Sequence, residues 1–431
     1  MKIKDELGLA LSGASAAAAD GFRQAAHAYH RYAGDPLPLL QAACADSPGF
    51  VMAHALTAYL TLLGSNAEAQ ALGVAAFETA KDLPATDRER GHVTAIGHML
   101  AGELRAAGRV LEDVSIDHPR DALALQAGQI IDFLLGDSRM LRDRIGRARP
   151  AWSPDMPGYH AVLGMHAFGL EETGLYDRAE AAGREAIELE PRNGWARHAV
   201  AHVLEMQDRR AEGVAWLRGD VRAWTEESFF QVHNWWHLAL FHLGLGEIDE
   251  VIALYDGPVW GARSDMSVDL IDAAALLWRL HLRGIELGER WSALADVYEA
   301  RGGFAQNAFE DAHAMMAFVG AGRTAAAGEL LAAQAGAVAD NAGFVAEVGR
   351  PVLEGLLAFG QGDNARAVES LREVRNRSAR FGGSHAQRDL IDLTLIEAAS
   401  RNGDRGLERA LLAERAEALP LAGRPSRRLA A

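Results

Sequence analysis

Apolar residues recur every three to four positions along most of the chain, with polar residues between them. This spacing is typical of amphipathic α-helices, which bury one face and expose the other. Ala, Leu, Glu and Arg, all good helix formers, dominate the composition, and no convincing run alternates in the manner of a strand. The pattern therefore predicts an all-α protein built from short helices of about 10–16 residues.

A repeated arrangement of small and apolar residues lies over this periodicity. Each copy has a small residue in a first helix, a glycine turn, alanine early in a second helix, and often a closing proline. Small residues let paired helices approach closely, and each hairpin then buries its remaining apolar face on the next one. Starts near residues 88, 160 and 232, with weaker copies near 122–126 and 194, give a period of about 34–38 residues. The copies are Ala95, Gly102, Leu104, Ala107, Leu111, Pro119; Leu163, Ala167, Gly174, Tyr176, Ala179, Ala186, Pro191; Ala239, Gly246, Ile248, Val251, Tyr255; and Gly355, Gly362, Ala367, Leu371.

This repetition predicts the fold class and the domain organisation. We expect a tetratricopeptide-like α-solenoid of helical hairpins, curved or closed around a central groove. Residues 1–420 should form a single array, with the proline-rich stretch 148–158 as the place to look for an internal boundary. Residues 421–431 are expected to be a disordered tail. A first helix should start within 14–19, capped by Ser12 or Ser15.

Composition and charge limit the classes of partner that the protein is expected to bind. The chain has 431 residues, 43 Lys and Arg against 59 Asp and Glu, and a formal charge of −16. Nucleic acid and anionic membranes attract basic surfaces, so we expect neither as a partner. No apolar run approaches a membrane span, and the acidic start lacks a signal-peptide core. The single cysteine, Cys44, excludes an internal disulfide and a cysteine-rich zinc site, and we expect a cytoplasmic location.

The sixteen histidines are unevenly distributed and mark the candidate site. His198 and His202 are four residues apart, with Glu205 three further on, so all three share one helix face. His233 and His237 repeat the four-residue spacing in the next hairpin. First helices line the groove in tetratricopeptide arrays, as a matter of family resemblance. Two later strings, Glu310-Asp311-Ala312-His313 and Gly382-Gly383-Ser384-His385-Ala386-Gln387-Arg388-Asp389, add further polar residues.

Three interpretations of these residues remain open. A divalent metal such as zinc could bind His198, His202, His233 and His237, although Ala199 stands where the zincin motif has its glutamate. A metal-free pocket could instead use histidine beside carboxylates for acid–base chemistry. The same residues could also simply hydrogen-bond between helices. For the pocket, we assign catalytic roles to His202, Glu205, His237, Asp311 and His313. Ligand-binding roles go to His198, His233, Asn234, Trp236, Gln387, Arg388 and Asp389.

At this point the sequence resembles the tetratricopeptide repeat protein 38 family, which is found in bacteria and animals. The matching strings are Phe50–Ala55, Asp117–Pro119 with Ala122–Leu125, Pro154–Pro157, Phe168–Glu172, Val200–His202 with Glu205–Met206, His233–His237, Asp311–His313, and Gly382–Ser384 with Ala386–Asp389. The resemblance covers about residues 50 to 390 and implies the helical-repeat fold. It implies no catalytic assignments.

Two functions from different classes follow. The first is a groove that forms a pocket for a small polar or peptide-like ligand, with hydrolytic or acid–base catalysis as an extension. The alternative is a scaffold for a protein partner, which needs an open groove that accepts an extended segment. Substrate, reaction and oligomeric state are open at this stage.

Overall fold

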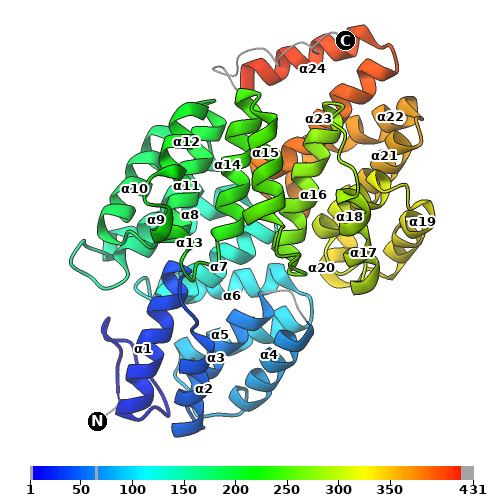
Figure 1. The fold of residues 1–431 in the computed structure, drawn as a ribbon. Helices are drawn as coiled ribbons and strands as arrows, with labels where there is room; N and C mark the ends of the chain where they lie inside the picture. The colour runs from blue at the N-terminus through cyan, green and yellow to red at the C-terminus, as the bar shows by residue number, and fades with distance from the viewer. Residues whose placement is uncertain (1–2, 64–66, 419–431) are drawn as a thin grey trace. The chain divides into compact units, whose positions relative to one another are not determined.

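The computed structural model describes residues 3–63 and 67–418, and Figure 1 shows helix following helix throughout this part of the chain. The only extended pairings in it are two isolated β-bridges, Lys4 with Ala10 and Ala33 with Ser228. The predicted all-α fold is therefore confirmed. The predicted tail, 421–431, lies outside the described residues.

The helices follow the repeat predicted from the sequence. First helices of successive hairpins start at Asp87, Ala122, Tyr159, Gly194 and Gln231, so their starts are 35 to 37 residues apart. Each of the first three packs against the helix that follows it. Small residues permit this packing: a Cβ at Gly183 would lie only 2.6 Å from the Val200 side chain. The chain is thus a tetratricopeptide-like series of helical hairpins.

The helices fall into two compact units. Unit 1 comprises Met1–Val203 and Asp220–Gln231, and unit 2 comprises Leu204–Gly219 and Val232–Ala431. Unit 1 contains α1 (Ala16–Arg31), α2 (Leu37–Asp46), α3 (Val51–Leu62), α4 (Ala67–Ala80), α5 (Asp87–Leu100), α6 (Leu104–Asp117), α7 (Ala122–Leu134), α8 (Ser138–Ala148), α9 (Tyr159–Glu171), α10 (Tyr176–Leu189), most of α11 (Gly194–Met206) and α13 (Val221–Thr225). Unit 2 contains α12 (Arg210–Arg218), α14 (Gln231–Leu245, from Val232), α15 (Ile248–Leu254), α16 (Ser267–Leu282), α17 (Arg290–Arg301), α18 (Ala308–Gly320), α19 (Thr324–Ala333), α20 (Ala339–Phe344), α21 (Arg350–Gly360), α22 (Asn364–Val374), α23 (His385–Arg401) and α24 (Arg405–Ala418).

Helix starts follow local capping chemistry. α1 begins directly after Ser15, whose hydroxyl accepts a hydrogen bond from Ala18 N, so of the two predicted caps Ser15 is the one used. Ser384 and Gln387 form a reciprocal capping box at the start of α23. The preceding Gly383 has a φ of +79°, and a Cβ there would lie 2.4 Å from the Phe309 ring. Both the backbone and the packing therefore require glycine at this position.

The proline-rich interruption lies within unit 1. Arg149–Ala151 forms a short 3-10 helix, and Trp152 donates from Nε1 to the Pro119 carbonyl oxygen at 2.8 Å. Trp152 is buried, and the half-buried Met156 packs against the same core cluster. The interruption is thus a packed connection. The expectation of a single array over 1–420 stays a prediction.

A buried ion-pair network fixes the N-terminal part of unit 1. Arg88 on α5 donates to Asp121 at 2.7 Å and to the carbonyl oxygen of Ala10 at 2.7 Å. The next residue, Glu89, accepts from the backbone N of Ser12 at 2.8 Å. The segment 10–12 is therefore attached to a helix that lies almost 80 residues later in the sequence.

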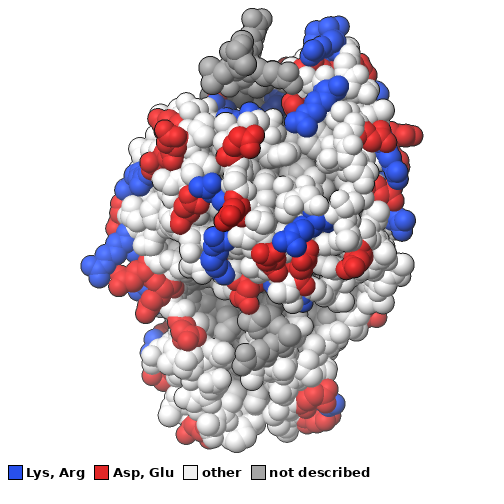
Figure 2. Space-filling view, turned by 45° about the vertical axis from the view of Figure 1, so that its right-hand side comes forward, with Lys and Arg blue, Asp and Glu red and all other residues white. Residues whose placement is uncertain are grey.

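The remaining expectations concern the surface and Cys44. Figure 2 shows one face on which acidic and basic side chains are interspersed, without a broad basic patch on that face. None of the helices within 3–63 and 67–418 combines the length and apolarity needed to cross a membrane. Burial raises the pKa of Cys44 to about 11, and its Sγ lies 3.6 Å from His54 Nδ1. A thiol with this pKa is protonated at neutral pH and is a poor nucleophile.

Candidate functional site

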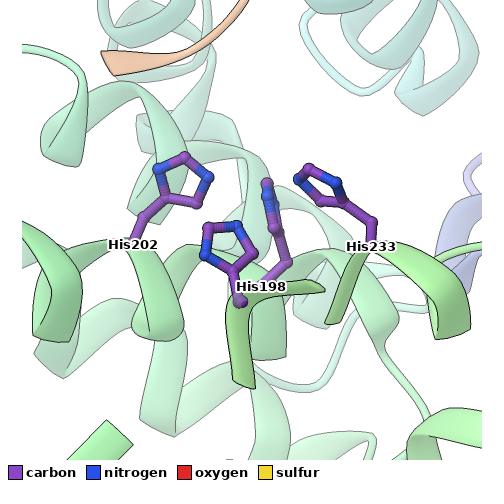
Figure 3. A group of neighbouring side chains, drawn as sticks. His198, His202 and His233 are labelled. Atoms are coloured by element: carbon purple, nitrogen blue, oxygen red, sulfur yellow. The ribbon is translucent and has the colours of Figure 1, made fainter. Parts of the chain in front are cut away.

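The predicted site residues are divided between the two units. His198 and His202, which Figure 3 shows on neighbouring turns of one helix, belong to unit 1. All the others belong to unit 2: Glu205, His233, Asn234, Trp236, His237, Asp311, His313, Gln387, Arg388 and Asp389.

One face of α14 in unit 2 stacks three of the predicted rings. His233, Trp236 and His237 are three and four residues apart, a spacing that places them on neighbouring turns. The ring centroids of His233 and Trp236 lie 5.2 Å apart and the planes are stacked. The His237 ring meets both edge-on at 4.9 Å. Trp236 and His237 are fully buried.

Asp272 on α16 orients His233. The Asp272 carboxylate lies 2.8 Å from His233 Nδ1, which therefore carries the proton and donates. In the neutral ring, this arrangement leaves Nε2 as the acceptor nitrogen. Burial raises the pKa of Asp272, while the neighbouring His233 and Arg279 act in the opposite direction. An oriented histidine backed by a buried carboxylate is the arrangement that general bases use.

Arg279, seven residues after Asp272 on the same helix, interacts with four of the predicted unit 2 residues: Trp236, Glu205, His313 and Asp389. Its guanidinium carbon lies 5.4 Å from the centroid of the Trp236 ring, within cation–π range. Its side chain donates to the carbonyl oxygens of Ala275, at 3.2 Å, and Ala386 on α23. Burial lowers the pKa of Arg279 to about 10, so the group keeps its charge at neutral pH.

Acidic groups surround Arg279. Asp389 on α23 forms a two-pronged ion pair with Arg415 of α24 and also interacts electrostatically with Arg279. Burial would raise the pKa of Asp389, but Arg415 lowers it below its usual range. Burial raises the pKa of Glu205, against the opposing effects of Arg210 and Arg279. Charges from four different helices thus meet in this part of unit 2, which we call the Arg279 centre.

Several buried polar atoms in unit 2 lack a hydrogen-bond partner among the described residues. Among them are both amide atoms of Asn234, the Trp236 Nε1, the Glu205 Oε2 and the His313 Nε2; Tyr255, Trp291 and Gln334 of unit 2 also have such atoms. The Trp236 ring makes the cation–π contact with Arg279, and Glu205 and His313 interact electrostatically with Arg279. Buried polar groups in folded proteins are nearly always hydrogen-bonded, so orphaned groups around one residue indicate bound water or a ligand.

His313 and Asp311 on α18 have fixed protonation preferences. His313 Nδ1 donates to the Phe309 carbonyl oxygen at 2.8 Å, which leaves Nε2 as an acceptor. Burial lowers the pKa of His313 to about 4, so the ring is neutral at neutral pH. Asp311 accepts from Ala305 N at 3.0 Å and from Gln334 at 2.9 Å, and burial raises its pKa to about 6.

The three predicted residues at the start of α23 have different partners. Gln387 completes the capping box with Ser384, and Arg388 donates to the Gly383 carbonyl oxygen. Asp389 alone among them joins the Arg279 centre. The roles that we predicted for Asp311, Gln387 and Arg388 stay predictions, with these local contacts as the alternative explanation of their presence.

In unit 1, His198 and His202 lie within an aromatic environment. Their ring centroids are 4.3 Å apart, and the buried Phe168 on α9 contacts both rings at 5.5 Å. His198 also stacks on Phe230 at 5.3 Å. His202 Nδ1 lies 3.6 Å from Glu171 Oε2, and both side chains are fully buried.

Sequence reasoning missed Asp272, Arg279 and Glu171. The signal was nevertheless present: α16 is a long apolar helix in which Asp272 and Arg279 are seven residues apart and share a face. Charged residues in a helix that is otherwise apolar on all sides are costly to bury unless they have partners.

Comparisons with known proteins find only distant structural similarity. No family model matches the chain. The solved structures similar to it include a human IFIT1 dimer with m7Gppp-AAAA, at 12% identity and a TM-score of 0.45, and a monomeric IFIT1 mutant with Gppp-AAAA, at 13% identity and a TM-score of 0.44. Both matches cover 94% of this chain, and 94% and 91% of those chains. At this level of similarity neither match carries information about function.

Proposed function

We propose that this protein binds a small polar or peptide-like ligand at the Arg279 centre of unit 2. The observation that supports the proposal most strongly is the set of buried polar atoms around Arg279 without partners among residues 3–63 and 67–418. A purely structural network gains nothing from such atoms, because each costs about 1–3 kcal/mol. A ligand that hydrogen-bonds to them would recover that free energy on binding.

The orphaned atoms indicate what the ligand offers. The Trp236 Nε1–H is a donor and requires an acceptor, whereas His313 Nε2 requires a donor. The positive charge of Arg279 is already offset by Asp389 and Glu205, so a strongly anionic ligand is not needed for balance. A neutral or zwitterionic molecule with an amide or similar donor–acceptor group fits this set.

Acid–base catalysis is a second candidate, favoured specifically by the His233–Asp272 pair. In this scheme His233 removes a proton from the ligand or from a water molecule, and Asp272 holds the ring in the required tautomer. His237, adjacent to both His233 and Trp236, belongs to the same proposal. Catalytic roles for His202 and Asp311 remain proposals without comparable support.

A protein-interaction scaffold is the alternative function. Extended peptides bind to exposed groove residues, whereas Trp236, His237 and His313 are buried within unit 2. This burial favours a small ligand over a peptide partner. Membership of the tetratricopeptide repeat protein 38 family is part of the proposal too, since it rests on the strings that include His233–His237 and Gly382–Asp389.

Ligand capture from a cell extract tests the binding proposal. The full chain is incubated with a metabolite extract, separated from unbound molecules and denatured, and the released compounds are identified by mass spectrometry. Arg279→Met keeps most of the side-chain stem but removes the charge. The matched control is Arg283→Met, which also removes an arginine bonded to a backbone carbonyl, that of Leu243.

We expect compounds that are retained by the wild type and Arg283→Met but lost from Arg279→Met. Equal retention by all three, or none by the wild type, would contradict the proposal. For catalysis, His233→Asn and Asp272→Asn should both lose turnover of a captured compound, whereas the control His281→Asn should keep it. Undiminished turnover in His233→Asn would exclude this histidine as the base.

A further inference from the structure

We propose that Glu171, Glu172 and His202 form a divalent metal site within unit 1, separate from the Arg279 centre. One potential ligand atom from each residue lies within 4.8 Å of the others, and His202 Nδ1 is 3.6 Å from Glu171 Oε2. All three residues are buried. A single ion placed among atoms with this spacing needs only small side-chain movements to reach bonds of about 2.0–2.2 Å.

Electrostatics favours a cation at this place. Glu171 is the last residue of α9 and Glu172 is its C-cap, so both carboxylates lie at the end of the helix where its dipole is negative. Two buried carboxylates at such an end raise one another's energy and that of the helix terminus. A divalent ion offsets both carboxylates and the helix end at once.

The donor atoms indicate the class of metal. Carboxylate oxygens with one imidazole nitrogen suit zinc and manganese, whereas calcium and magnesium prefer oxygen throughout. One additional contact supports Glu172: Ser138 Oγ donates to Glu172 Oε2 at 3.3 Å, which restrains that carboxylate. The His198 ring lies next to His202 on the same helix face, with the two ring centroids 4.3 Å apart.

A second group in unit 1 has similar residues but lacks the required lone pair. The potential ligand atoms of His27, His160 and Glu190 also lie within 4.8 Å of one another. Asn193 accepts from Ala196 N through its oxygen, so its amide nitrogen must donate to His160 Nδ1 at 3.0 Å. The proton of His160 is then on Nε2, and neither nitrogen offers a free lone pair to an ion. The inference is therefore confined to Glu171, Glu172 and His202.

Titration calorimetry with zinc and manganese chloride tests this site. The full chain is prepared without a histidine tag and stripped with a chelator, because a tag would itself bind zinc. We expect saturable binding of a single equivalent of one of the two ions, with a rise in Tm. Glu171→Gln, which keeps the shape of the side chain, should weaken binding about 10- to 100-fold. Glu188→Gln, an exposed residue on α10, should bind like the wild type.

Further variants separate the outcomes. His202→Gln should weaken binding as Glu171→Gln does, and circular dichroism shows whether each variant is folded. If one fails to fold, the other and Glu172→Gln give the answer. Arg279→Met should keep the metal affinity, so the site is tested independently of the proposed ligand function. No saturable binding by the wild type, or unchanged affinity in folded Glu171→Gln and His202→Gln, would overturn the inference.

Discussion

Two buried polar regions of this protein, the Asp121 network in unit 1 and the Arg279 centre in unit 2, differ in how completely their atoms are hydrogen-bonded. Both oxygens of Asp121 have partners: Arg88 and His92 contact one, and Ala124 N donates to the other. His92 reaches Tyr59 through its second nitrogen. Around Arg279, by contrast, Trp236 Nε1 and His313 Nε2 have no partner within the described chain.

The difference distinguishes two uses of buried polarity. The Asp121 network is nearly complete, because among its bonded residues only Arg88 Nε lacks a partner within the described chain. Such a network specifies one packing arrangement and is destabilised by the loss of any member. An incomplete one keeps unsatisfied groups at a cost in stability, which is the usual signature of a place reserved for another molecule. Three sets of single-residue changes test whether this distinction holds.

The largest effect is expected at the Asp121 network. Asp121→Ala leaves Arg88 buried without its carboxylate and should lower the free energy of unfolding by about 3–5 kcal/mol. Urea denaturation followed by circular dichroism measures it. The control Asp87→Ala removes a carboxylate that is almost fully exposed and should change stability by less than about 0.5 kcal/mol. A loss below about 1 kcal/mol for Asp121→Ala would show that the network is not a stabilising unit.

The next effect is a pH dependence near the Arg279 centre. The pKa of His313, about 4, lies below its unfolded value of about 6.5, so its contribution to the free energy of unfolding falls as the pH drops through this range. The pKa of Asp311, about 6, lies above its unfolded value of about 3.9, so its contribution to the free energy of unfolding falls as the pH rises through that range. The two contributions change with pH in opposite directions and partly cancel in the wild type.

Removing either residue should expose the contribution of the other. As the pH rises from 4 to 7, the free energy of unfolding of Asp311→Asn should increase by about 2–3 kcal/mol relative to the wild type. Over the same rise, that of His313→Gln should decrease by a similar amount. Urea titrations at a series of pH values measure both differences. Parallel pH profiles for the wild type and the two variants would contradict the assigned protonation states.

The smallest effect compares two buried asparagines. Asn193 in unit 1 uses its amide fully, with bonds to His160 and Ala196, whereas neither amide atom of Asn234 has a partner in the described structure. Asn234→Leu should therefore stabilise the protein by about 1 kcal/mol, and Asn193→Leu should destabilise it by about 2 kcal/mol. Thermal unfolding resolves the sign of each change. Destabilisation of equal size at both sites would remove the distinction between the two regions.

The fold could be predicted closely because it follows from short-range patterns. Helices start at Asp87, Tyr159 and Gln231, each one residue from the predicted repeat start, because glycine turns and small residues mark every hairpin. The stacked face of α14 was predictable for the same reason, since His233 and His237 are four residues apart. The spacing of residues within one helix does not predict which distant helices that helix will contact. The partners of Arg279 come from four other helices, α11, α14, α18 and α23, and nothing in the sequence near Arg279 identifies them.

Some site residues were assigned from side-chain chemistry within short polar strings, although a local pattern already offered an explanation. Ser384 followed by Gln387 has the spacing of a capping box, which accounts for Gln387 without a ligand. Asp311 similarly joins a backbone amide six residues earlier. Polar residues beside a glycine break often cap a helix or bind nearby backbone amides. Asp272 and Arg279, which lie within an apolar helix, are the stronger indication of a site.

The attachment of residues 10–12 to Arg88 and Glu89 has a consequence for synthesis. These residues leave the ribosome before α5 does, because their hydrogen-bond partners follow about 77 positions later, and Arg88 itself requires Asp121. A nascent chain that has not reached Asp121 therefore cannot give residues 10–12 their native set of contacts. This segment is made early but is secured only after Asp121 has been made.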